Sequence, residues 1–117
     1  MAAILIVEDD LETREGIATL LRVEGYPVTT AENGKIALDW LLAGNRPALI
    51  ILDLAMPVMD GWEFMSHFRT LDGKASAAPV VVWTAFREQV EGAVLTIRKP
   101  NVHDLLNAVH EHYRPSD

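Results

Sequence analysis

The stretch that decides the fold is Leu49-Ile50-Ile51-Leu52-Asp53-Leu54-Ala55-Met56-Pro57-Val58-Met59-Asp60-Gly61. It begins with four large apolar residues without alternation, which predicts a strand buried on both faces, as in a parallel sheet. One carboxylate, Asp53, follows this strand at its carboxyl end. Ligands bind at that edge of open α/β sheets, and a carboxylate there is costly unless it is paired or near solvent. Asp53 is therefore the first candidate for chemistry.

Similar apolar runs recur along the chain, with helical patterns between them. The predicted strands are residues 4–7, 27–30, 49–52, 79–83 and 94–97. The predicted helices are residues 11–24, 34–43, 61–70 and a last helix that begins after Asn101. Strands and helices in alternation predict an α/β fold, a parallel sheet covered by helices on both sides. Right-handed crossovers favour a doubly wound, flavodoxin-like sheet of five strands in the order 2-1-3-4-5.

The helical segments carry start signals, stop signals and apolar faces. The expected N-caps are Asp10, Asn33, Asp60 and Asn101, and the expected stops are Gly25 and Gly44. The residues expected to face the core are Ile17, Leu20 and Leu21, with Leu11 and Val23 near the edge of that face, then Ile36, Ala37, Trp40 and Leu41, and finally Val102, Leu105, Leu106 and Val109. Trp62 and Trp83 are also expected to pack, and residues 72–76 to form a loop.

Length and composition exclude several classes of function. The 117 residues predict a single domain, residues 1–117, in which residues 114–117 are a tail or the start of a linker. Ten basic against seventeen acidic residues give a net charge of −7, which argues against binding of nucleic acid by this domain. There is no cysteine, no basic leader and no apolar run long enough to cross a membrane, so we expect a cytoplasmic protein.

Polar residues follow four of the predicted strands. Glu8 and Asp9 follow the first strand, Asp53 the third, Thr84 the fourth and Lys99 the fifth. In the predicted strand order these four strands are neighbours, so the five side chains are expected to converge on one edge. Crowded carboxylates raise one another's pKa values, and a divalent cation relieves the repulsion. Oxygen ligands with room for water and phosphate suit Mg²⁺, and the nearby amine and hydroxyl complete a predicted phosphoryl site.

Four motifs lie in order over nearly the whole chain: V-E-D-D, D-L-A-M-P-V-M-D-G, T-A and K-P. Together they resemble the receiver domain of two-component response regulators. The resemblance implies that Asp53 is the phosphoacceptor. The phosphoryl donor would be the phosphohistidine of a histidine kinase or a histidine phosphotransfer protein.

The resemblance also implies roles for the other residues at this edge. Asp9 would bind Mg²⁺ directly together with the phosphoacceptor, Glu8 would act through a water molecule, and the backbone carbonyl of Ala55 would complete the protein's ligands. Thr84 would contact the phosphoryl group as the switch hydroxyl. Lys99 would form an ion pair with the phosphoacceptor or its phosphate.

Two features depart from the family pattern. The segment between Thr84 and Lys99 is short by about two helical turns, so we expect a shortened or irregular fourth helix over residues 85–93. Thr96 stands where the family usually has Tyr or Phe, whose rotation accompanies the switch. Both departures lie on the face that the family commonly uses for output, which predicts unusual coupling.

Three functions remain in competition at this point. The leading one is a phosphorylation-controlled module that acts only on itself and is not an enzyme, with autodephosphorylation at an unknown rate. Its partners would be an attached output domain or an effector protein, and a homodimer is left open. The alternative is a pseudo-receiver, a protein-interaction module no longer controlled by phosphorylation. A phosphatase with an aspartyl nucleophile usually carries a second Asp two residues later, where this chain has Ala55.

Overall fold

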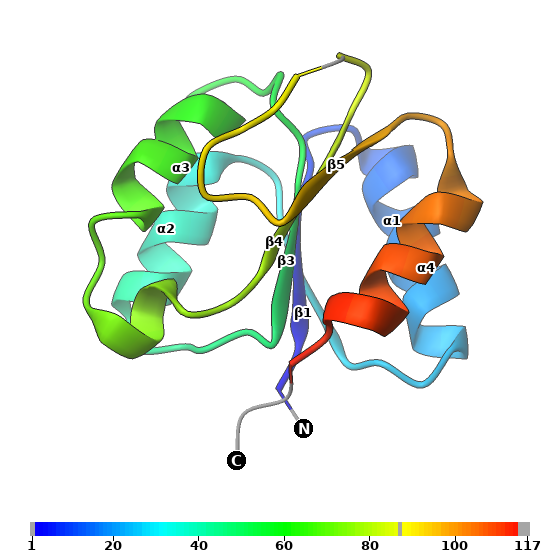
Figure 1. The fold of residues 1–117 in the computed structure, drawn as a ribbon, viewed down its shortest axis with the longest axis horizontal. Coiled ribbons are helices and arrows are strands. Elements are labelled where there is room, and N and C mark those ends of the chain that lie inside the picture. Colours follow the sequence, from blue (N-terminus) through cyan, green and yellow to red (C-terminus); the bar gives the residue numbers. More distant parts are fainter. Residues whose placement is uncertain (1, 87, 115–117) are drawn as a thin grey trace.

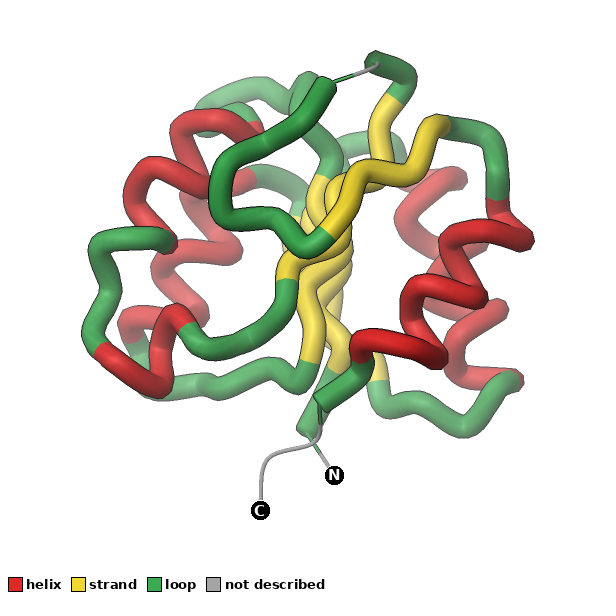
Figure 2. Tube along the Cα trace, in the orientation of Figure 1, coloured by secondary structure: helices red, strands yellow, loops and turns green. Residues whose placement is uncertain are grey.

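The computed structural model describes residues 2–86 and 88–114. Five parallel strands form one sheet in the order β2-β1-β3-β4-β5, which confirms the predicted α/β fold and topology. The strands are β1 (Ile4–Val7), β2 (Val28–Ala31), β3 (Leu49–Leu52), β4 (Val80–Thr84) and β5 (Leu95–Arg98). The helices are α1 (Leu11–Val23), α2 (Gly34–Leu42), α3 (Gly61–Phe68), the 3₁₀ turn η1 (Gly73–Ser76) and α4 (Val102–His112). Helices α2 and α3 cover one face of the sheet, and α1 and α4 cover the other (Figures 1 and 2).

The sheet separates two apolar cores. Alternate residues along a strand point to opposite faces, so one strand supplies both cores. The strand residues of the core beside α2 and α3 are Leu5, Val7, Ala31, Ile50, Leu52, Val80 and Val82. Those of the core beside α1 and α4 are Ile4, Ile6, Leu49, Ile51, Val81 and Trp83. Burial of each such Val, Leu or Ile stabilises the fold by about 1.5–3 kcal/mol, which explains why the central strands have no alternation in sequence.

The predicted caps are confirmed at all four helices. Asp10, Asn33, Asp60 and Asn101 each accept a hydrogen bond from a backbone N–H in the first turn of the helix that follows. Such a bond satisfies one of the donors that a helix start leaves free. Asp10 follows the end of β1 closely, and Asp60 ends the loop that connects β3 to α3, so these two caps also fix the segments that follow β1 and β3.

The prediction of which residues face the core was partly wrong for α1 and α2. Leu11, Leu20 and Val23 are 61%, 40% and 78% exposed, and Ile36 is 42% exposed. The buried helix residues are Ile17, Ala18 and Leu21 in α1 and Gly34, Ala37, Leu38 and Leu41 in α2. In α2 these positions follow the i, i+3, i+4, i+7 rule. The sequence contains two adjacent apolar stripes in each helix, and packing on the sheet selects one of them.

Some boundaries also differ from the prediction. β2, β4 and β5 each begin and end one residue later than predicted, α3 ends at Phe68, and η1 replaces part of the predicted loop at residues 72–76. In the described residues between 11 and 112, no helix is long and apolar enough to cross a membrane. Of the predicted tail, residues 115–117 lie outside the described residues.

The connection between β4 and β5 is irregular, as predicted. Residues 85, 86 and 88–94 form no helix, and this segment lies on the side of the sheet that α3 covers (Figure 1). Arg69, the C-cap residue of α3, pairs with Glu91 at 2.7 Å. Trp62 donates a hydrogen bond from Nε1 to Glu88 at 3.2 Å, and its ring lies 6.1 Å from that of Phe86. Trp62 therefore packs, as predicted, and its partner is this loop.

The loop between β3 and α3 contains a residue in an unfavourable conformation. The N–H of Met59 donates to the carbonyl of Pro57 at 2.8 Å, and Val58 between them has φ 70. This hydrogen bond closes a three-residue turn of the rare, strained type. A β-branched residue with positive φ is an outlier because its Cβ meets the backbone.

We predict that Val58→Asn stabilises the protein by about 1 kcal/mol, since Asn tolerates positive φ. Val58 is 78% exposed, so little apolar burial is lost. The matched control is Val23→Asn, at an equally exposed position (78%) in the helical conformation. Urea denaturation measures both variants. Equal stabilities of the two variants would contradict the assigned strain.

The same loop depends on Gly61. Its N–H donates to the carbonyl of Leu54 at 2.9 Å. A Cβ at Gly61 would collide with the backbone carbonyl of Asp53 and come within 2.8 Å of the Leu54 Cα. The absence of a side chain therefore lets α3 begin directly against the residue that follows β3.

We predict that Gly61→Ala destabilises the fold by about 2–3 kcal/mol through this overlap. Gly16→Ala provides the opposite case, because Gly16 lies inside α1 and a methyl group on its Cα would meet no atom within 4 Å. We expect it to stabilise the protein by about 0.5–1 kcal/mol. Thermal denaturation of both variants tests the pair, and a tolerated alanine at position 61 would refute the steric argument.

Candidate functional site

The carboxyl ends of β1, β3, β4 and β5 meet at one edge of the sheet, because the strands are parallel and adjacent in that order. Glu8 and Asp9 follow β1, Asp53 follows β3, Thr84 ends β4 and Lys99 follows β5. The structure brings all five of these predicted site residues to this edge. At each of these four strands, a polar residue ends or directly follows the apolar run, and these polar residues form the edge.

Three carboxylates form a tight group there. Oxygen atoms of Glu8, Asp9 and Asp53 lie within 4.8 Å of one another. Glu8 and Asp53 are only 3% and 7% exposed, whereas Asp9 is open to solvent. The backbone N–H of Leu54 donates to Asp53 Oδ1 at 2.8 Å. Oxygen donors at this spacing, with one side open to water, are suited to one hard divalent cation.

Lys99 supplies the positive charge of the group. Its Nζ donates to Glu8 Oε1 at 2.5 Å and to Asp53 Oδ2 at 3.3 Å. The pair with Asp53 matches the geometry expected from the sequence. The shorter contact with Glu8 was not predicted, although the adjacent ends of β1 and β3 make it possible for one ammonium group to reach both carboxylates.

The pKa values of Glu8 and Lys99 are both shifted at this site. Burial raises the pKa of Glu8 to about 7; the hydrogen bond from Lys99 opposes the rise and the charge of Asp53 adds to it. Burial acts to lower the pKa of Lys99, but its hydrogen bond to Glu8 and the charges of Asp53 and Glu8 outweigh burial and raise that pKa. Lys99 thus stays charged at neutral pH. The single positive charge of Lys99 is too small to neutralise three ionised carboxylates at Glu8, Asp9 and Asp53.

Thr84 has a polar atom without a partner. Its side chain is completely buried, and its Oγ1 forms no hydrogen bond with any residue that the structure describes. An unsatisfied buried hydroxyl costs about 1–3 kcal/mol. The backbone around it is well held, since its carbonyl accepts the N–H of Lys99 at 2.7 Å. A hydroxyl in this position is available to an oxygen of a bound group.

The structure also places the remaining predicted ligand and the neighbouring acid. The carbonyl of Ala55, two residues after Asp53, accepts no hydrogen bond within residues 2–86 and 88–114. Asp10 accepts two hydrogen bonds from Thr13, at 2.9 and 2.6 Å, and these bonds lower its pKa. Asp10 is therefore occupied as a cap, and the acidic pair of the site is Glu8 with Asp9.

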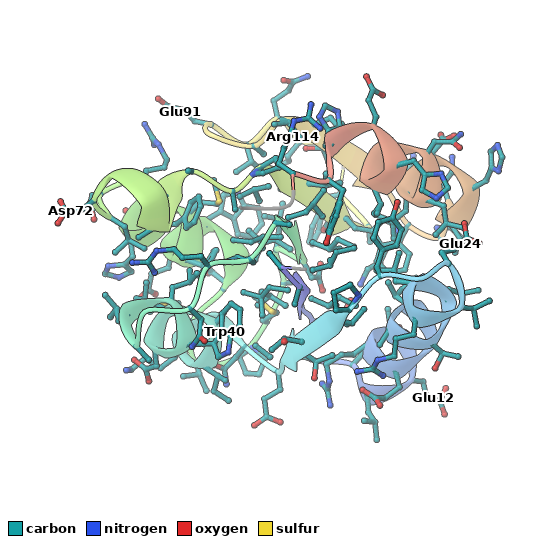
Figure 3. All side chains as sticks on the ribbon, turned by 90° about the horizontal axis from the view of Figure 1, so that it is seen from below. Glu12, Glu24, Trp40, Asp72, Glu91 and Arg114 are labelled. Carbon is teal, nitrogen blue, oxygen red and sulfur yellow. The ribbon has the colours of Figure 1, made fainter. Side chains whose placement is uncertain are left out.

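Most other acids are spread over the surface. Figure 3 shows Glu12, Glu24, Asp72 and Glu91 at the periphery, with their side chains pointing away from the two cores. Solvated and dispersed carboxylates of this kind interact weakly. The net charge of −7 therefore comes mostly from dispersed acids, and the carboxylates at the strand ends differ from them in being crowded together.

Two residues near the site make contacts that the sequence did not predict. Arg14 of α1 donates from Nη1 to the backbone carbonyls of Glu8 at 2.9 Å and Asp9 at 3.4 Å. Trp83 is buried as predicted, but its ring also lies under Lys99, with Nζ 5.3 Å from the centroid. Both contacts depend on how the chain turns after a strand, which apolar periodicity does not report.

The raised pKa of Glu8 gives a pH-dependent prediction for metal-free protein. A carboxyl group whose pKa is higher in the folded state destabilises the fold as pH rises from the ordinary value of 4.5 to about 7. Glu8→Gln removes this effect. We predict that the variant gains stability relative to the parent protein between about pH 5 and pH 8, measured by urea denaturation in a chelator. A constant stability difference across this range would contradict the assignment.

Comparison with known proteins agrees with this arrangement. A family model described as the response regulator receiver domain matches residues 4–110. The CpxR homolog of Haemophilus influenzae, a transcriptional regulatory protein, is 38% identical over 91 residues, covering 78% of this chain and 37% of that protein. Response regulator MprA of a Mycobacterium species is 42% identical over 82 residues, covering 70% and 34%. The chain thus spans about a third of the length of these two regulators.

Solved structures show the same fold. Response regulator TrrA of Thermotoga maritima, solved in complex with Mg(2+)-BeF, has a TM-score of 0.82 and 33% identity, covering 95% of this chain and 98% of that chain. TrrA in complex with the histidine kinase ThkA gives a TM-score of 0.80 at 32% identity, covering 95% and 97%. Because the family model covers most of its length, the chain belongs to the response regulator receiver domain family.

Proposed function

We propose that this chain is a phosphoacceptor receiver domain, in which Asp53 accepts a phosphoryl group from a phosphohistidine. The observation that carries the proposal is the contact of the Lys99 ammonium with Asp53 Oδ2 at 3.3 Å, beside two further carboxylates. The donor would be a histidine kinase or a histidine phosphotransfer protein. The complex of the relative TrrA with the histidine kinase ThkA supports this choice.

The transfer follows from the groups around Asp53. A carboxylate oxygen of Asp53 attacks the phosphorus, the bond between phosphorus and the donor imidazole breaks, and the imidazole leaves with the bonding electrons. The N–H of Leu54 holds the other carboxylate oxygen in place. Lys99 lies where it can neutralise charge on the transferred oxygens, and such charge stabilisation is most of what a protein contributes to phosphoryl transfer.

The oxygen donors fit a magnesium ion. Asp9, Asp53 and the carbonyl of Ala55 would hold it, with Glu8 acting through water. The fit rests on the hard oxygen ligands, on the crowding of three acids against one amine and on the open carbonyl of Ala55. When bound, Mg²⁺ supplies positive charge to the phosphoryl oxygens.

Thr84 is the proposed switch. A phosphoryl oxygen on Asp53 would give the buried hydroxyl the hydrogen-bond partner that it lacks among the described residues. Movement of Thr84 then shifts an existing equilibrium between two conformations. Thr84 is followed directly by the irregular loop, which Glu91 ties to Arg69 at the C-terminal end of α3. We propose that output passes through this loop, because Thr96 on β5 has no ring to rotate.

The alternative is an interaction module without phosphoryl control. The loop at residues 85–94 and Thr96 favour it, because both alter the usual route of the signal. The contacts among Glu8, Asp53 and Lys99 argue against it, because a site that serves no reaction gains nothing from three crowded acids. Under either function the partner would be an attached output domain, an effector protein or a second copy of the chain.

The test is intact-mass measurement after incubation with acetyl phosphate and Mg²⁺, followed by size-exclusion chromatography. We expect a gain of one phosphoryl group in the parent protein and none in Asp53→Asn. Asp60→Asn is the matched control, since Asp60 caps α3 and lies outside the carboxylate group; it should be modified like the parent. No gain in the parent protein, or an equal gain in Asp53→Asn, would remove the proposal.

A further inference from the structure

Trp83 lies directly beneath the amine of the site. It is the second-last residue of β4 and is 6% exposed. Its ring belongs to the core beside α1 and α4, while the next residue, Thr84, ends the strand at the site. The Nζ of Lys99 stands over the ring, 5.3 Å from its centroid. One face of the indole therefore forms part of the surface on which the ammonium group rests.

This geometry allows an attractive contact between cation and ring. A cation within about 6 Å of an indole centroid is attracted by the negative face of the ring, and Trp is the strongest partner among the aromatic residues. The attraction increases when the cation is shielded from water, and the Lys99 side chain is only 23% exposed. The contact between Lys99 and Trp83 is therefore stronger than a cation–π contact at a fully exposed site.

The anionic contacts of Lys99 are not sufficient to fix its position. Its flexible stem can reach both Glu8, at 2.5 Å, and Asp53, at 3.3 Å. Phosphorylation of Asp53 would change the charge at one of these partners, and binding of a cation near Glu8 would weaken the other. The ring of Trp83 carries no charge and lies in the core, so neither change would alter the charge of this partner of Lys99.

Packing alone does not require a Trp at this position. The indole Nε1 is buried and forms no hydrogen bond with the part of the chain that the structure describes. A buried N–H without a partner has a cost, which a phenyl ring or an aliphatic side chain would avoid. The large ring face beneath the ammonium is the feature that those smaller side chains lack.

We propose that Trp83 is a positioning residue, which holds the ammonium group of Lys99 between Glu8 and Asp53 by a cation–π contact. The proposal rests on the phosphoacceptor function for its effect on rate. The contact itself does not depend on that function, because it forms without a bound metal ion or phosphate. The same contact makes the emission of Trp83 a reporter of the position of Lys99.

The first measurement is NMR of metal-free protein, with the Lys99 resonances assigned by their loss in Lys99→Arg. Protons over the face of an indole are shifted upfield. We expect the ε-methylene protons of Lys99 to be shifted in this direction, less so in Trp83→Phe and not at all in Trp83→Leu. Trp40→Phe is the control, since Trp40 packs beside the opposite core and should leave the shift unchanged.

The second measurement is the rate of phosphorylation by acetyl phosphate in the same variants. We expect Trp83→Leu to be slower by about fivefold, as the loss of one partly buried cation–π contact implies, and Trp83→Phe to lie between it and the parent. If Trp83→Leu does not fold, Trp83→Phe and the shift in the parent protein still decide the question.

An unshifted Lys99 in the parent protein, or parental rates in Trp83→Phe and Trp83→Leu, would overturn the positioning role. Failure of the function itself has a different signature: the parent protein would show the upfield shift of Lys99 but take up no phosphoryl group. The two proposals can therefore fail separately.

Discussion

The structure depends on one electrostatic constraint: a single ammonium group faces three carboxylates at the edge of a parallel sheet. Lys99 contacts Glu8 and Asp53 directly, and Asp9 completes the group on its open side. Burial prevents water from screening this imbalance, as the raised pKa of Glu8 indicates. Such crowding of like charges is unfavourable by itself, and a bound cation would relieve it. The rest of the fold maintains the carboxylates in this position.

Several features of the backbone serve that purpose. The strand order brings four strand ends to one edge, and the caps Asp10 and Asp60 fix the chain just after β1 and just before α3. Gly61 allows α3 to start against the backbone of Asp53 and Leu54. On the side of β4 and β5, residues 85, 86 and 88–94 form no helix, and contacts of Glu88 with Trp62 and of Glu91 with Arg69 tie this segment to α3 and its C-cap.

Much of this arrangement could be predicted from the sequence because it depends on local signals. The strand runs and the caps predicted the topology, and the polar residues after four of the strands predicted the edge on which the site lies. The short segment after Thr84 also predicted the irregular loop. The choice between adjacent apolar stripes in α1 could not be predicted, since it depends on the shape of the sheet. The contacts of Lys99 with Glu8 and Trp83 likewise depend on how three strand ends meet in space. The partners of the loop, such as Glu88 for Trp62, are set by the same kind of packing.

The most direct test of the account is a calorimetric titration of the unphosphorylated protein with Mg²⁺ at several pH values, in two buffers that differ in ionisation enthalpy. The account predicts saturable binding at one site, weaker as the pH is lowered through about 7, with release of protons from Glu8 on binding. NMR of the same samples should show changes at the ends of β1, β3, β4 and β5. Absence of saturable binding, or binding that is independent of pH and releases no protons, would contradict the central claim that the crowded acids require a cation.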